Sequence, residues 1–164
     1  CALPILRYVA GVDPSGGGAD AFTLAIVHRE DSGRIVHDVM KGRGRVGTLA
    51  PDLADVVREY AAILTRYGCQ DVVGDRYAGQ WVRQAFREAG IRYRDVDRDR
   101  SGYYLEVEPL FSQGRIDLLD HRDLGQSVNF VEHGQPLRIA AFFKRLLKST
   151  IWRKIIGYGF ETGR

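Results

Sequence analysis

Cysteine and long apolar runs are scarce in this chain of 164 residues. Its two cysteines, Cys1 and Cys69, form no CxxC pattern, so nothing in the sequence indicates a disulfide framework or a zinc site. No apolar run approaches the ~20 residues that a membrane-spanning helix needs, and no signal peptide is visible. We therefore expect no membrane association and an intracellular, cytoplasmic location. No GxxxxGKS/T phosphate loop occurs, which excludes an ATPase motor of that type.

Lysine is also rare. The chain has 24 Lys and Arg against 21 Asp and Glu, for a net charge of +3, and nearly all of its basic residues are arginines. Arginine suits bidentate contacts with phosphate. A genome of high GC content, in which arginine codons dominate, explains the bias equally well. The composition, 45% hydrophobic and 27% charged, is that of one globular domain. Because the first residue is Cys rather than Met, we expect a piece of a longer protein.

The order of apolar and polar residues predicts a three-stranded meander followed by strands that alternate with helices. The expected strands cover residues 8–12, 22–28, 34–40, 71–74 and 91–96, and the expected helices cover residues 49–67, 80–89 and 100–113. We expect Thr48 to cap the first helix, and Trp81 and Phe86 to pack into the core from the second. This order predicts an α/β fold, a mixed sheet flanked by helices of the ribonuclease-H-like type.

Two aspartates, Asp13 and Asp75, each close an apolar strand and precede a turn. If the first and fourth strands are parallel neighbours, their carboxyl ends lie about 4.8 Å apart. Two carboxylates at that spacing can share Mg²⁺ or Mn²⁺, the ions that support two-metal cleavage of phosphodiester bonds. We therefore predict Asp13 and Asp75 as catalytic, metal-binding residues, with Asp20 as an auxiliary metal ligand. For either aspartate alone, a turn former or helix cap is the alternative.

A six-residue motif points to a different ligand. Residues 42–47 match GxGxxG between a strand and a helix, which is the context of dinucleotide binding. However, the strand before the motif is the third of a meander, not the first of a parallel unit. We interpret these residues as a surface loop whose arginines can touch a DNA backbone.

Three segments resemble the C-terminal nuclease domain of phage large terminase subunits. Residues 8–20, YVAGVDPSGGGAD, resemble the opening of that domain, where the first strand delivers a metal-binding Asp, followed by a glycine-rich turn and a second Asp. Residues 72–79, VVGDRYAG, resemble its second acidic strand. Arg100–Tyr103 and the residues from Glu106 to Leu119 resemble the segment before its last catalytic helix. The resemblance covers residues 7–123.

This resemblance implies a metal-dependent endonuclease that uses Mg²⁺ or Mn²⁺ to cut concatemeric double-stranded DNA during packaging of a phage or prophage genome in the bacterial cytoplasm. It also implies an N-terminal ATPase in the whole protein, with the small terminase subunit and the portal protein as partners. The chain departs from the family at the third carboxylate, which normally lies on a C-terminal helix. After Leu124 the only acidic residues are Glu132 and Glu161.

We therefore expect two parts: a ribonuclease-H-like nuclease domain over residues 1–123, and an atypical C-terminal segment over residues 124–164. That segment is expected to be helical from Arg138 to Ile156. Whether residues 124–164 are native to the family is left open by the sequence. The missing acid leaves catalytic activity open as well. The alternatives are another ribonuclease-H-like nuclease of the resolvase or transposase type, a non-catalytic DNA-binding domain of this fold, and an actin-like or sugar-kinase-like ATP-binding fold.

Overall fold

The computed structural model describes residues 7–14, 21–44, 49–75, 79–95, 109–110, 112–117 and 119. Its elements are β1 (Tyr8–Asp13), β2 (Phe22–Arg29), β3 (Ile35–Arg43), α1 (Leu53–Arg66), β4 (Asp71–Gly74), α2 (Gln80–Glu88), β5 (Arg92–Asp95) and β6 (Ile116–Asp117). All five predicted strands and the first two predicted helices are confirmed. Most of the third expected helix, and the whole segment 124–164, lie outside the described residues.

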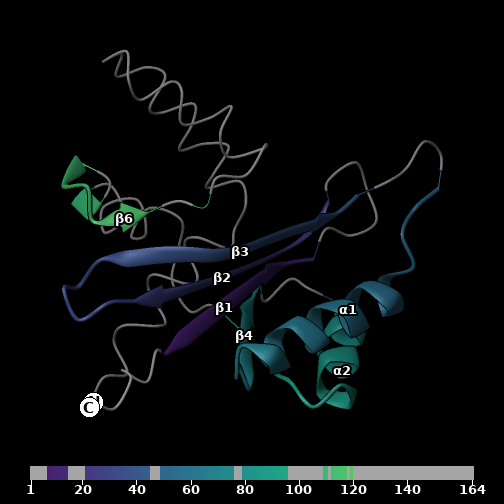
Figure 1. Ribbon diagram of the computed structural model, residues 1–164. Coiled ribbons are helices and arrows are strands. Elements are labelled where there is room, and N and C mark those ends of the chain that lie inside the picture. Colours follow the sequence, from purple (N-terminus) through teal and green to yellow (C-terminus); the bar gives the residue numbers. More distant parts are fainter. Residues whose placement is uncertain are drawn as a thin grey trace.

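The strands form one mixed sheet in the order β5-β4-β1-β2-β3-β6. β2 is antiparallel to both β1 and β3, whereas the pairs β1–β4, β4–β5 and β3–β6 are parallel. Among the described strands, only β2 therefore runs against the others (Figure 1). This architecture confirms the predicted α/β fold, and it places the carboxyl ends of β1, β4 and β5 at one edge of the sheet.

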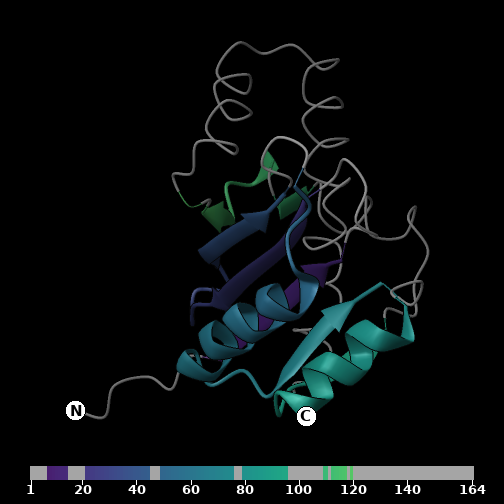
Figure 2. The same cartoon turned by 90° about the vertical axis from the view of Figure 1, so that its right-hand side faces the viewer.

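Helices α1 and α2 lie next to each other on one face of the sheet (Figure 2). Apolar residues at helical spacing make the contact: Val57, Tyr60 and Leu64 of α1 and Phe86 of α2 are buried against the strands. The Tyr60 hydroxyl also donates a hydrogen bond to the backbone carbonyl of Phe22, at 2.6 Å. These helices thus fix one face of the sheet as the core.

Two expectations about the helices are wrong. α1 begins at Leu53 rather than Leu49, because the carboxylate of Asp52 caps it by accepting a hydrogen bond from the Ala54 amide, at 2.8 Å. Thr48 itself lies outside the described residues. Phe86 is buried as predicted, but Trp81 is 44% exposed. The buried stripe of α2 is set by Val82 and Phe86, one turn apart, and Trp81 lies about 100° around the helix from Val82.

Candidate active site

The sheet brings Asp13 and Asp75 to adjacent positions at one edge. The last paired residues of the parallel strands β1 and β4 are Val12 and Gly74. Asp13 and Asp75 each follow that pair by one residue, so their backbones are separated by about one strand spacing, roughly 4.8 Å. Both residues are partly exposed to solvent. The expected pairing is therefore present, and the role of the pair as metal ligands stays a prediction.

Asp13, the last residue of β1, lies on the face of the sheet opposite α1 and α2. Val12 packs in the core beneath the helices, and successive side chains of a strand point to opposite faces. Asp13 therefore points away from the helices. On β4 the same alternation places Val72 and Gly74 on the helix side, and Asp75 follows Gly74 just beyond the end of the strand. Because β1 is apolar as far as Val12, the sequence alone did not distinguish the two faces.

Tyr93 of β5 supports the backbone of β4 at this point. Its hydroxyl donates a hydrogen bond to the main-chain carbonyl of Asp75, at 2.9 Å. To reach that carbonyl the ring crosses Gly74, where an added Cβ would lie only 1.9 Å from the Tyr93 hydroxyl oxygen. Burial raises the pKa of Tyr93, and the nearby charges of Asp95, Asp75 and Asp13 raise it further, against the opposing effect of Arg83. The hydroxyl is therefore a permanent donor at neutral pH.

Asp95 is a third acidic residue at this edge, and the sequence analysis did not single it out. It is paired with Gly74 in the β4–β5 register, so it lies on the helix side of the sheet. There it forms an ion pair with Arg83 of α2, at 2.9 Å. The signal was the same as for the other two, an acid at the end of a strand. Its partner and its face make it a structural residue in this arrangement.

Two arginines of β5 lie on the face of the sheet opposite the helices. Arg92 and Arg94 are exposed and alternate with Tyr93, which packs on the helix side. Both make ion pairs with Asp71 of β4, at 2.7 Å and 3.2 Å. Arg94 is paired with Val73, two residues before Asp75. Both guanidinium groups are therefore bound at the start of β4, on the outermost strand pair of the sheet.

Within the described residues, no group of three or more histidines, cysteines, aspartates or glutamates is arranged to hold a metal ion. Asp13 and Asp75 supply the hard oxygen atoms that Mg²⁺ and Mn²⁺ prefer, and they fit part of such a ligand set. Asp20, the predicted auxiliary ligand, lies outside the described residues. The described residues thus carry two of the three predicted metal ligands.

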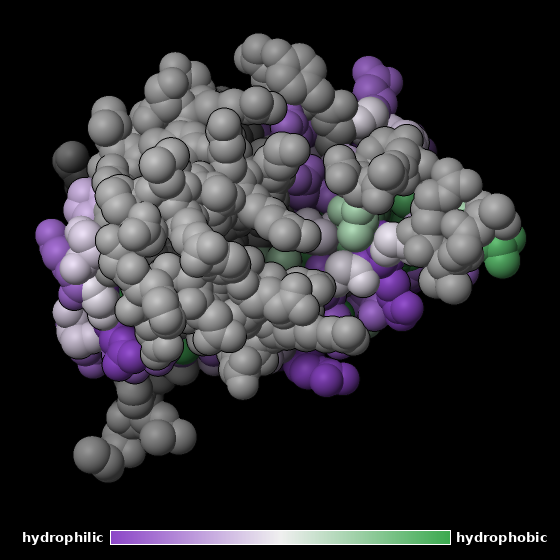
Figure 3. All heavy atoms as spheres, turned by 90° about the horizontal axis from the view of Figure 1, so that it is seen from above, coloured by the Kyte–Doolittle hydropathy of each residue, from purple (hydrophilic) through white to green (hydrophobic). Residues whose placement is uncertain are grey.

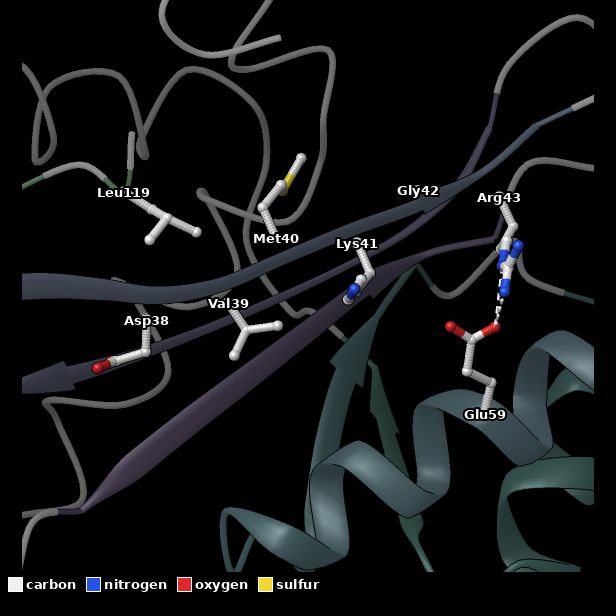
Figure 4. A pocket seen from close by; sticks show the side chains of 8 residues that line it. All are labelled: Asp38, Val39, Met40, Lys41, Gly42, Arg43, Glu59 and Leu119. Atoms are coloured by element: carbon white, nitrogen blue, oxygen red, sulfur yellow. Dashed lines mark hydrogen bonds and ion pairs between the residues drawn. The ribbon is translucent and has the colours of Figure 1, made fainter. Parts of the chain in front are cut away.

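A pocket lined by described residues lies elsewhere. It has a volume of about 630 Å³ and lies along β3, where Arg43 forms an ion pair with Glu59 of α1 at 2.7 Å (Figure 4). Gly42 and Arg43, the start of the GxGxxG motif, are part of strand β3 itself and not of a turn that leads into a helix. The rest of the motif, residues 45–47, lies outside the described residues. In the view from above, hydrophilic residues predominate among those described (Figure 3).

The fold is the one seen in the nuclease domains of phage large terminases. The large terminase of bacteriophage HK97 matches with a TM-score of 0.64 and 17% identity, over 76% of this chain and 32% of that one. The large terminase nuclease of the thermophilic phage G20c matches with a TM-score of 0.61 and 16% identity, over 78% of this chain and 66% of that one. The P22 large terminase nuclease domain matches with a TM-score of 0.53 and 9% identity, over 73% and 65%.

These are likenesses of fold, and they agree with the predicted mixed sheet flanked by helices. The chain spans 32% of the HK97 protein and 66% and 65% of the other two. By sequence, no family model and no curated protein matches it. No helix in the described part of the chain is long and apolar enough to cross a membrane.

Proposed function

We propose that residues 1–123 form a metal-dependent DNA endonuclease domain of the phage terminase type, which cuts double-stranded DNA during genome packaging. The observation that carries this proposal is the register of β1 and β4, which sets Asp13 and Asp75 side by side at the carboxyl ends of parallel strands. The matching fold of the terminase nucleases supports it. The small terminase subunit and the portal protein are the partners that this assignment implies.

In this mechanism Asp13 and Asp75 hold Mg²⁺ or Mn²⁺ through their carboxylate oxygens. When bound there, such an ion would supply Lewis-acid chemistry for hydrolysis of a phosphodiester. The carboxylates would also fix where the phosphodiester lies, at the carboxyl ends of β1 and β4. Arg94, whose guanidinium lies near Asp71 on β4, would provide positive charge for another phosphate of the DNA backbone.

Cleavage of supercoiled plasmid in Mn²⁺ tests the proposal. We expect the wild-type chain to nick or linearise the plasmid, and we expect EDTA, Asp13→Asn and Asp75→Asn each to abolish cleavage. Asp117→Asn is the matched control. Asp117 lies on β6, at the far side of the sheet from β4, and its half-exposed carboxylate forms an ion pair with Arg34. This control is expected to cleave like the wild type.

The alternatives give different results. A folded wild-type chain that binds DNA without cleaving it would favour the non-catalytic DNA-binding domain. Cleavage that survives in both Asp13→Asn and Asp75→Asn would refute the acidic pair as the active site. A clear preference for four-way junctions over linear duplexes would favour a resolvase.

A further inference from the structure

The hydrogen bond from Tyr93 falls on Asp75, one of the two residues whose carboxylates form the proposed metal site. The paired register of β4 ends at Gly74 on both sides, opposite Val12 of β1 and opposite Asp95 of β5. Asp75 follows the last paired residue, where the sheet ladders no longer fix the chain. The Tyr93 hydroxyl, 2.9 Å from the Asp75 carbonyl oxygen, extends the support of β5 to that residue.

The Tyr93 ring is itself held from two elements. Phe86 of α2 packs against it with ring centroids 6.1 Å apart, and the Arg83 guanidinium lies 5.8 Å from its centroid. Arg83 is anchored in turn by Asp95, at 2.9 Å. Below the ring, Gly74 leaves the space that any larger residue would fill. These contacts hold the phenol in one orientation over β4.

We propose that Tyr93 is a positioning residue for the metal site, acting through the backbone of Asp75 to fix the direction of its carboxylate. This inference rests on the proposed function, because it assigns Tyr93 to the same acidic pair. Tyr93 does not touch the ion. Its hydroxyl holds the peptide that follows Asp75, and so limits the conformations that the carboxylate can adopt before an ion binds.

The test is a calorimetric titration of the full chain with Mn²⁺ at constant pH, without DNA. Tyr93→Phe keeps the ring and its packing but removes the donor. We expect its Mn²⁺ affinity to fall about three- to tenfold, the equivalent of one hydrogen bond. Tyr60→Phe is the matched control. It also removes a buried tyrosine hydroxyl that donates to a backbone carbonyl, but that carbonyl belongs to Phe22, which is not a proposed metal ligand. The control is expected to lose stability to urea while its Mn²⁺ affinity stays at the wild-type value.

The outcomes distinguish a failure of the positioning role of Tyr93 from a failure of the metal site itself. If Asp75→Asn loses Mn²⁺ binding but Tyr93→Phe binds within twofold of the wild type, the positioning role is wrong and the metal site stands. If Tyr60→Phe loses as much affinity as Tyr93→Phe, the effect is one of general stability, and the positioning role is again wrong. If the wild type shows no Mn²⁺ binding that depends on Asp75, both the metal site and the role of Tyr93 are overturned.

Discussion

Replacement of Gly74 by alanine puts the packing of Tyr93 on β4 to a direct test. An ideal Cβ at this position would lie 1.9 Å from the Tyr93 hydroxyl oxygen, 2.2 Å from Cζ and 2.6 Å from Cε2. Ordinary van der Waals contact begins at 3.4 Å. The hydroxyl must therefore retreat by about 1.5 Å (3.4 minus 1.9), which breaks its hydrogen bond to Asp75.

Two costs follow from that displacement. The lost hydrogen bond contributes about 0.5–1.5 kcal/mol, and overpacking of a fitted site costs about 1–3 kcal/mol. Alanine recovers about 0.4–1 kcal/mol by restricting the unfolded chain. We therefore expect Gly74→Ala to lower the free energy of unfolding by roughly 1–4 kcal/mol, measured by urea denaturation with circular dichroism.

Gly42→Ala is the control for this measurement, since a Cβ there would meet its nearest neighbour, Thr23 Cγ2, at 3.6 Å, which is ordinary contact. Its stability should change little. In a Tyr93→Ser background the ring is gone, so Gly74→Ala should cost much less than in the wild type, and the double-mutant cycle measures that coupling. The reasoning fails if Gly74→Ala is no more costly than Gly42→Ala, or if the cycle shows no coupling.

Three further predictions use other features of the structure. Arg94→Ala should reduce the slope of log DNA affinity against log salt by about 1 in a fluorescence titration, whereas Arg58→Ala, on the exposed side of α1, should leave it unchanged. Burial raises the pKa of the Cys69 thiol to about 11. In a Cys1→Ser chain this thiol should therefore resist a disulfide reagent at pH 8 and react as the pH rises toward 11 or when the chain unfolds. Fast labelling of the native chain at pH 8 would contradict this prediction. Asp52→Ala should lower stability by about 1 kcal/mol through the lost helix cap, and Asp52→Ser should recover most of it; an unchanged melting temperature for the alanine variant would refute the cap.

The sequence was sufficient to predict β1 to β5, α1 and α2, and the adjacency of Asp13 and Asp75. β1 and β4 are short apolar runs that each end in Asp, and a meander followed by alternating helices leaves few arrangements other than a parallel β1–β4 pair. The adjacency of Asp13 and Asp75 then follows from register alone. The exposed Trp81 shows the limit of pattern reasoning, because a nine-residue helix offers too few turns to tell the edge of its buried stripe from the centre.

The residues around the pair were missed for a physical reason. Tyr93, Arg94 and Asp95 follow one another in β5, and their roles depend on which face of the sheet each one occupies, which the helices decide only after folding. One local signal was available. A glycine inside a buried strand often marks the close approach of another group, and Gly74 directly precedes the predicted site residue Asp75.

The two faces of β5 allow metal binding and DNA binding to be tested separately. Alternation places Tyr93 on the helix side, where it contacts the backbone of Asp75, and Arg94 on the opposite side, where it contacts Asp71. Tyr93→Phe should therefore weaken Mn²⁺ binding without changing the salt dependence of DNA binding. Arg94→Ala should do the reverse, since Arg92 still pairs with Asp71 and keeps the strand in place. If either variant shifts both quantities equally, the two faces do not act independently, and β5 contributes to the site only as a structural unit.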